Sequence, residues 1–196
     1  MNRIAVYSGS NYGNRTDYQE GANRLGRALA TRGIGLVYGG SRLGLMGEVA
    51  NAVLDGKGDV IGVMPKGLFP KEAAHPGLST FHETEDMPSR KKRMAELADG
   101  FIALPGGVGT YEELFEMLSW AQLGIHAKPV GLLNVSGFFT PLITMLTHTV
   151  QEGFMKESHL KLFCVADNPD ELIAQMIHYQ PPALGVKWKQ LTDLQR

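Results

Sequence analysis

The sequence is organised around one stretch, which reads Leu104-Pro105-Gly106-Gly107-Val108-Gly109-Thr110-Tyr111-Glu112-Glu113. The apolar residues 100–104 that lead into it are typical of a buried strand, and apolar residues at helical spacing follow it. Glycines let the backbone turn sharply and bring its N–H groups close to a ligand. A glycine loop that opens a helix binds anions, because unpaired N–H groups and the helix dipole both point at it. The stretch therefore predicts a strand, a phosphate-binding loop and a helix.

The same residues also fit a purely structural interpretation. Thr110-x-x-Glu113 matches a capping box, in which Thr110 bonds the N–H of Glu113 and Glu113 reaches back to Thr110. A cap alone does not need three glycines after a proline. Nor does it need Glu112, Glu113 and Glu116 crowded beside an anion site, where carboxylates repel the ligand. The combination favours a bound phosphate with a carboxylate held nearby for chemistry, and the capping box stays as the alternative.

Length and composition indicate an ordinary globular protein. The 196 residues suit one domain with a substantial core, and 43% hydrophobic and 20% charged residues are typical of such a domain. We expect residues 1–180 to form a single nucleotide-binding domain. Residues 181–196 form a C-terminal tail of uncertain order, which could pack against a partner chain.

Charge and residue usage argue against several functional classes. A net charge of −1 offers no basic face to nucleic acid or a membrane surface, and no apolar stretch approaches the ~20 residues of a membrane span. We expect no signal peptide, because the N-terminal apolar run is too short. The one cysteine, Cys164, lies in an apolar run and predicts a structural thiol in a reducing cytoplasm. The six histidines show no metal spacing, so we expect no metal and no cofactor.

The order of the elements predicts an α/β fold. Apolar runs predict strands over residues 3–7, 34–38, 59–64, 79–82, 101–104, 130–134 and 162–166. Helical spacing predicts helices over residues 17–32, about 47–54, 87–99, 111–123, 138–152 and 169–178. Strands that alternate with helices, and that are mostly continuous apolar runs, indicate a mostly parallel sheet of about seven strands with helices on both faces.

Three of the expected strands end in small residues. The loops after them read Ser8-Gly9-Ser10, Gly39-Gly40-Ser41 and Pro105-Gly106-Gly107. In a parallel sheet the ligand lies in the crevice beyond the carboxyl ends of the strands. Three glycine loops that converge on one crevice predict a ligand of nucleotide size.

Known cofactor motifs narrow the choice of nucleotide. A dinucleotide site needs G-x-G-x-x-G after the first strand and an acidic residue at the end of the second, and the sequence has neither. The P-loop motif G-x-x-x-x-G-K-[ST] does not occur either. A mononucleotide remains, as a substrate, an effector or a carried ligand.

The motifs resemble those of a known family. Pro105 to Glu113 matches the P-G-G-x-G-T-x-x-E signature of the Lonely Guy (LOG) family, the cytokinin riboside 5′-monophosphate phosphoribohydrolases. The likeness continues through Tyr38-Gly39-Gly40, Gly44-Leu45-Met46-Gly47, Met87-x-x-Arg90-Lys91 and Trp120-Ala121-Gln122-Leu123-Gly124-Ile125-His126. Some members carried the label lysine decarboxylase, and bacterial members resemble AMP nucleosidases. The resemblance implies a Rossmann-like three-layer sandwich, a homodimer, and hydrolysis of a nucleoside 5′-monophosphate to free base and ribose 5-phosphate.

The resemblance also assigns site residues. Its nucleotide-binding positions fall on Glu72, Arg90, Lys91, residues 107–113 and Ser119. With the small residues of the loops, the predicted substrate-binding set is Ser8, Gly39, Gly40, Glu72, Met87, Arg90, Lys91, Gly106, Gly107, Val108, Gly109, Thr110, Tyr111, Glu112, Glu113 and Ser119.

Three positions depart from the family pattern. Ser119 replaces the threonine of plant members and keeps the hydroxyl, and Ser41 replaces the third glycine of its loop. Pro88 stands inside M-x-x-R, which a helix tolerates in its first turn.

Residue types suggest a mechanism with two catalytic residues. Cleavage of an N-glycosidic bond builds positive charge on the ribose, as glycoside hydrolysis does. We assign Glu113 to stabilise that charge and to orient or deprotonate water, with Glu112 as the weaker candidate. Arg90 stays charged and can stabilise the departing base. The glycine loop and Thr110 would hold the 5′-phosphate. We expect Lys92 and Arg93 to face solvent.

Two other functions stay open at this point. A non-catalytic nucleotide or cofactor carrier would keep the loop for binding alone, although the presence of both Arg90 and Glu113 argues against it. Amino-acid decarboxylation needs a lysine that forms a Schiff base with pyridoxal phosphate, and nothing in the sequence singles one out. The sequence does not choose between adenine and an N6-prenylated adenine as the base.

Overall fold

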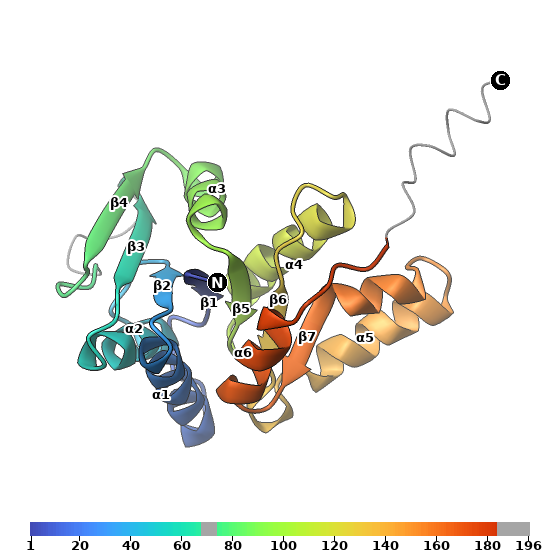
Figure 1. Cartoon of the computed structure of the whole chain (residues 1–196), viewed down its shortest axis with the longest axis horizontal. Coiled ribbons are helices and arrows are strands. Elements are labelled where there is room, and N and C mark those ends of the chain that lie inside the picture. The colour runs from blue at the N-terminus through green and yellow to red at the C-terminus, as the bar shows by residue number, and fades with distance from the viewer. Residues whose placement is uncertain (68–73, 184–196) are drawn as a thin grey trace.

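Within the described residues, 1–67 and 74–183, seven strands form one sheet in the computed structural model. The strands are β1 (Arg3–Tyr7), β2 (Gly35–Tyr38), β3 (Val60–Pro65), β4 (Thr80–Thr84), β5 (Gly100–Ala103), β6 (Val130–Leu133) and β7 (Phe163–Ala166). Their order is β4-β3-β2-β1-β5-β6-β7, and every neighbouring pair is parallel (Figure 1). The expected parallel α/β sheet is confirmed.

Helices cover both faces of the sheet. They are α1 (Thr16–Thr31), α2 (Gly44–Asp55), α3 (Met87–Leu97), α4 (Val108–Gln122), α5 (Thr140–Gln151) and α6 (Pro169–Ile177), with the short 3₁₀ helices η2 (Val135–Gly137) and η3 (Glu157–Leu162). Alternate residues of a strand point to opposite faces, so Ile4 packs with α1, α2 and α6 while Ala5 packs with α3 and α4. Two apolar cores therefore sandwich the sheet.

The order of the strands creates a switch point at the centre of the sheet. From β1 the chain winds outward through β2 and β3 to β4, then crosses back to add β5 on the other side of β1. Tyr7 at the end of β1 pairs in register with Ala103 at the end of β5. The loops that leave these two strands therefore diverge to opposite sides of the sheet, which opens a crevice at their carboxyl ends.

The helix after the glycine loop begins earlier than the sequence suggests. α4 begins at Val108 rather than at residue 111, and Gly107 is its N-cap in an extended conformation. Thr110 is thus already inside the first helical turn, and Glu113 bonds another partner. The capping-box interpretation is wrong, because the N-cap of α4 is Gly107 and not Thr110. The side chain of Thr110 packs against the glycine loop instead.

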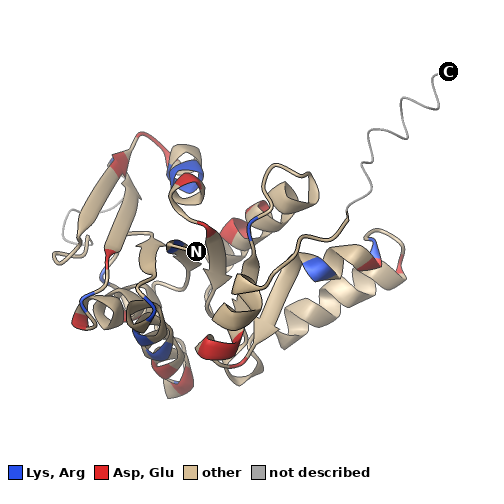
Figure 2. Cartoon of the chain, in the orientation of Figure 1, with Lys and Arg blue, Asp and Glu red and all other residues tan. Residues whose placement is uncertain are grey.

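Some of the predicted residues lie outside the part of the chain that the structure describes. Glu72 and residues 184–196 of the predicted tail lie outside the described residues. Among the helices that the structure describes, none is both long and apolar enough to cross a membrane. Figure 2 marks acidic and basic residues on the ribbon of α3, whereas α5 contains no Asp, Glu, Lys or Arg.

Candidate active site

Backbone contacts bring the predicted loops together at the switch point. The N–H of Gly9 donates to the carbonyl of Pro105 at 3.0 Å, and the N–H of Met46 donates to the carbonyl of Gly9 at 3.3 Å. A Cβ at Gly9 would lie 3.3 Å from the Cα of Gly106, so the loops need a residue without a side chain to pack this closely. Between them lies a cavity of about 480 Å³, which is a volume typical of small-molecule sites.

The N-terminus of α4 faces this cavity as an anion site. The first N–H groups of a helix have no intrahelical acceptor, and Gly107 offers them no side-chain cap. A Cβ at Gly106 would lie 2.1 Å from Oγ1 of Thr110, so packing within the protein requires that glycine. At Gly107 and Gly109 a Cβ would meet no described atom within 4 Å. Their open surroundings fit a ligand that approaches the backbone closely.

A buried ion pair lies on the floor of the crevice. Nη1 of Arg90 donates to Oε1 of Glu113 at 2.6 Å, and the two residues are only 7% and 9% exposed. Nε of Arg90 donates to the carbonyl of Val63 at 3.0 Å. A Cβ at Gly39 would lie 2.3 Å from Nη2 of Arg90, so this glycine gives the guanidinium its space. The pair joins α3 and α4 across the end of β2.

Local sequence fixes Arg90 in this position. Asp86 caps α3 by accepting a hydrogen bond from the N–H of Ser89 at 2.8 Å, and Pro88 lies in the first helical turn. The proline is therefore compatible with the helix, as expected. Arg90 follows in the same turn and points inward, where it is buried.

The ionisation of Glu113 depends on two opposing effects. Burial raises the pKa of Glu113 above its ordinary value, and the positive charge and hydrogen bond of Arg90 act in the opposite direction. Burying two charges is costly, and an apolar pair of similar size often gives a more stable protein. A perturbed carboxyl in a cleft, beside a fixed cation, indicates a catalytic role.

A second set of charges lies next to this pair. Nζ of Lys91 binds Glu112, and it donates to Oε1 of Glu116 at 3.1 Å. Burial lowers the pKa of Lys91, but the hydrogen bonds to the two carboxylates more than offset this and raise it overall. Glu112 is half-exposed and lines the cavity, whereas Lys91 is mostly buried and does not line it.

The structure brings most of the predicted substrate-binding residues to the cavity. Those that line it are Ser8, Gly39, Met87, Arg90, Gly107, Val108, Gly109, Thr110, Glu112 and Glu113. Gly40 and Gly106 are not among the residues that line it: Gly106 lines an adjoining hollow with Gly9 and Gly107, and Gly40 has a φ of 78° that favours glycine. Tyr111 turns away from the cavity and stacks on Phe138.

Ser119 lies elsewhere in this chain. It follows Val108 by eleven residues, which places it roughly 16 Å along the helix axis. There it lines a separate hollow with Phe115 and Leu146. Within one chain, therefore, Ser119 does not join the crevice that the sequence analysis assigned to it.

Sequence reasoning missed the apolar part of the cavity wall. Leu43, Met46 and Met64 line the cavity beside the predicted Met87. A usable signal existed for Met64, which lies near the carboxyl end of β3. Methionine adapts its shape to flat or irregular ligands, so this wall suits a purine base.

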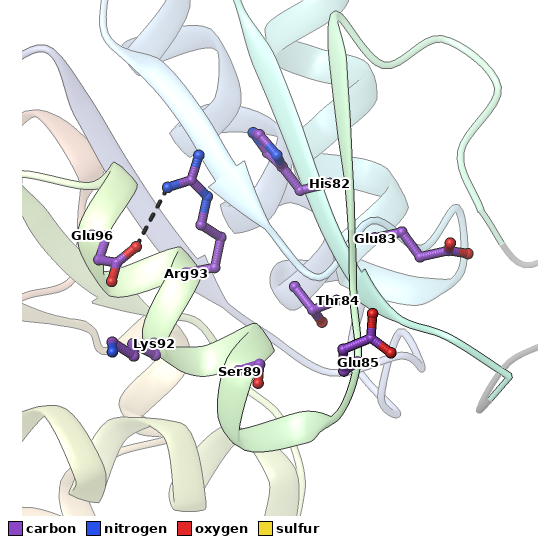
Figure 3. Close-up of a pocket in the computed structure, with 8 residues that line it drawn as sticks. All are labelled: His82, Glu83, Thr84, Glu85, Ser89, Lys92, Arg93 and Glu96. Atoms are coloured by element: carbon purple, nitrogen blue, oxygen red, sulfur yellow. Dashed lines mark hydrogen bonds and ion pairs between the residues drawn. The ribbon is translucent and has the colours of Figure 1, made fainter.

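A further hollow of about 350 Å³ separates β4 from α3. Figure 3 shows the ion pair of Arg93 and Glu96 on the helix, at 3.4 Å, with Glu83 and Glu85 on the side of the strand. Its charges are of mixed sign and reach solvent, and Lys92 is exposed there as expected. Such an open, mixed surface does not indicate a catalytic site.

No group of three or more potential metal ligands lies together among the residues that the structure describes.

Comparison with known proteins gives matches over most of the chain. A family model described as "Possible lysine decarboxylase" matches residues 46–176. The cytokinin riboside 5′-monophosphate phosphoribohydrolase LOG of Oryza sativa subsp. japonica is 48% identical over 95% of this chain and 77% of its own. The enzyme LOG7 of Arabidopsis thaliana is 48% identical over 91% and 82%. The molybdenum cofactor carrier protein of Chlamydomonas reinhardtii is 25% identical, with a TM-score of 0.70 over 91% and 97% of the two chains.

Proposed function

The chain belongs to the LOG family of cytokinin riboside 5′-monophosphate phosphoribohydrolases, and on this premise we propose that it hydrolyses the N-glycosidic bond of an adenosine 5′-monophosphate. The adenine carries an N6 substituent or none, and the products are the free base and ribose 5-phosphate. The observation that carries this proposal is the buried Arg90–Glu113 pair on the floor of a crevice beside an open helix N-terminus.

The 5′-phosphate binds at the N-terminus of α4 in this proposal. The free N–H groups of the first turn and the helix dipole supply the attraction. Gly107 and Gly109 have room for phosphate oxygens where other residues would carry a Cβ. This contact lies away from the bond that breaks, so its binding energy serves to position the ribose over Glu113.

Glu113 acts on the ribose. As the bond from C1′ to the base breaks, positive charge grows on the ribose ring, and the carboxylate of Glu113 stabilises it. Glu113 also orients the attacking water, whose oxygen bonds to C1′ while a proton goes to the departing base. Nη1 of Arg90 binds Glu113, and Nε binds a backbone carbonyl. Nη2, which lies next to Gly39, therefore remains to bind the ribose or the base.

The experiment follows release of free base by chromatography. Purified protein is incubated with AMP and, separately, with isopentenyladenosine 5′-monophosphate, and the faster substrate identifies the preferred base. Glu113→Gln removes the charge with little change of shape, while Glu112→Gln is the matched control on the neighbouring residue. We expect Glu113→Gln to bind nucleotide without releasing base and Glu112→Gln to lose less than about tenfold in activity.

A glycine pair tests the phosphate site. Gly107→Ala adds a methyl group where the protein leaves open space, so we expect normal folding and weakened nucleotide binding. Gly106→Ala adds the same methyl group, but against the side chain of Thr110. We expect this variant to have a lowered melting temperature. Unchanged nucleotide affinity in Gly107→Ala would contradict the proposed position of the phosphate.

A carrier function is the second candidate. It is favoured by the structural likeness to the molybdenum cofactor carrier protein, at 25% identity. A carrier binds its ligand without turnover. Tight binding of both nucleotides with no base released from either would therefore favour the carrier over the hydrolase.

We also propose that the functional unit is a homodimer that forms through α5. This helix has no charged residue, and Leu146 is its one buried residue in the described structure. Met145 is exposed, and Phe154 just beyond the helix is 89% exposed. A helix face without Asp, Glu, Lys or Arg that carries exposed apolar side chains is suited to a second copy of the chain. Light scattering after gel filtration tests it: we expect a dimer for the wild type and a monomer for Met145→Glu combined with Phe154→Glu.

A further inference from the structure

Two buried tyrosines end neighbouring strands in the middle of the sheet. Tyr7 ends β1 and Tyr38 ends β2, and they are 2% and 0% exposed. Neither hydroxyl has a hydrogen-bond partner among the described residues. They differ in the face that they occupy, because Tyr7 packs in the core under α3 and α4 while Tyr38 packs in the core under α1 and α2. Only Tyr7 therefore lies on the side of the catalytic pair.

Charged groups surround Tyr7 and not Tyr38. The charges that act on the Tyr7 hydroxyl are those of Glu113, Glu116 and Glu112 from α4 and Arg90 from α3. Lys91 of α3 binds two of these carboxylates. The Phe101 ring, which stacks on Tyr7 at 6.2 Å, also contacts His126 and Lys128.

The tyrosine hydroxyl is a neutral donor at every ordinary pH. Burial raises the pKa of Tyr7 far above its usual value, and the nearby Glu113 carboxylate raises it further. For Tyr38, burial alone raises the pKa. A tyrosine hydroxyl that keeps its proton is able to donate a hydrogen bond to a carboxylate.

A matching acceptor is present nearby. Oε2 of Glu116 is buried and has no partner among the described residues, although Oε1 of the same side chain binds Lys91. Tyr7 lines the same cavity as Arg90 and Glu113, and the charge of Glu116 acts on its hydroxyl. A buried water commonly bridges polar groups that otherwise lack a partner. Native proteins rarely leave such atoms unpaired, so each one needs an explanation.

We propose that Tyr7 is a positioning residue for Glu113, whose hydroxyl donates through a bridging water to the Glu113 and Glu116 carboxylates and holds Glu113 toward the ribose. The inference rests on the proposed function, because it takes Glu113 as the reacting carboxylate. A hydrogen bond to the charged form of a carboxyl favours that form. Tyr7 therefore works with Arg90 to keep Glu113 ionised in spite of its burial.

The test removes one oxygen atom. Tyr7→Phe keeps the ring and deletes the hydroxyl, and Tyr38→Phe deletes an equally buried hydroxyl on the other face as the matched control. In ¹³C-glutamate-labelled protein, with the Glu113 signal assigned through Glu113→Gln, we expect the Glu113 pKa to rise by about half to one unit in Tyr7→Phe. The acid limb of the kcat/KM profile for base release should move up by the same amount, with kcat lowered near that limb and KM almost unchanged. Tyr38→Phe should match the wild type in both readouts.

The outcomes separate this inference from the proposed function. If the Glu113 titration is the same in Tyr7→Phe and wild type, or shifts equally in both phenylalanine variants, the inference is overturned. If the wild type releases no base, the proposed function fails, and the titration still decides the role of Tyr7 without any turnover. If Tyr7→Phe does not fold, the NMR signal of the Tyr7 hydroxyl proton in the wild type decides. We expect this signal downfield, with a shift that follows the titration of Glu113. If no such signal is present, the inference is overturned.

Discussion

Two adjacent residues of α3 reach two adjacent carboxylates of α4, with different results. Arg90 pairs with Glu113 at 2.6 Å, and their side chains are 8% and 11% exposed. Lys91 pairs with Glu112, whose side chain is 51% exposed, and with Glu116. One pair lies on the crevice floor and the other borders solvent, although the residues are neighbours in sequence.

The difference shows which pair the fold retains for chemistry. Exposed ion pairs contribute little to stability and cost little to keep. A buried pair carries a desolvation penalty that its attraction repays only with good geometry and further hydrogen bonds. Arg90 supplies both, through Glu113 and the carbonyl of Val63. We therefore expect the inner pair, Arg90 with Glu113, to control catalysis and the outer pair, Lys91 with Glu112, to adjust its rate.

The largest effect should separate the two glutamates by activity. Glu113→Gln removes the charge that faces the ribose, and we expect the rate of base release to fall about 10³-fold, within the range for a positioned acid–base or charge-stabilising group. Glu112→Gln should lose less than about tenfold, because its side chain is partly solvated. The measurement is kcat for AMP by chromatography. Equal losses in the two variants would show that the pairs do not differ in function.

The next effect separates the two cations by stability. Arg90→Ala leaves the Glu113 carboxylate buried without a partner, which should lower the free energy of unfolding by about 3–5 kcal/mol. Lys91→Ala leaves Glu112, whose side chain is already half-exposed, and Glu116, which is partly exposed, so we expect a smaller loss than for Arg90→Ala, of about 1 kcal/mol. Urea denaturation of both variants gives the comparison. A small loss for Arg90→Ala would mean that Glu113 is already protonated in the folded protein.

Residue types and spacing allowed the parallel sheet and both members of the inner pair to be predicted from the sequence. Glycine at strand ends indicated the crevice, and the family signature indicated Arg90 and Glu113. Their bond to each other was not predicted, because it depends on how α3 and α4 cross the end of the sheet. The capping box failed for the same reason, since Glu113 meets a residue 23 positions away rather than its own helix cap.

Burial is the other property that the sequence did not convey. Tyr7 and Tyr38 end similar apolar strands, and which face each one occupies follows only from the register of the sheet. Ser119 shows the same limit, because a position that matches the family motif lies far along the helix from the crevice within one chain. Local pattern thus identified the elements, whereas side-chain environment required their assembly in space.

The pH dependence of stability gives a smaller effect that also separates the pairs. Burial raises the pKa of Glu113 in the folded protein. At a pH between the ordinary pKa of glutamate and this raised pKa, the native state therefore holds more protons than the unfolded state. The unfolding free energy should therefore fall as pH rises through this window. Glu113→Gln lacks this slope, whereas Glu112→Gln keeps Glu113 and should keep the wild-type slope. Urea titrations between pH 4 and pH 7 measure it, and a wild-type slope in Glu113→Gln would assign the slope to another group.

The smallest effect is the response of the two pairs to salt. Screening acts on charges that solvent reaches, and the Debye length falls from about 10 Å at 0.1 M to about 3 Å at 1 M salt. A double-mutant cycle on Lys91 and Glu112 should give a coupling of about 0.5 kcal/mol at low salt that falls by half or more at 1 M. The cycle on Arg90 and Glu113 should stay constant, because neither side chain is open to ions. If the inner coupling weakened with salt as the outer one does, ions would have to reach the crevice floor, and Arg90 and Glu113 would then be no better shielded from solvent ions than Lys91 and Glu112.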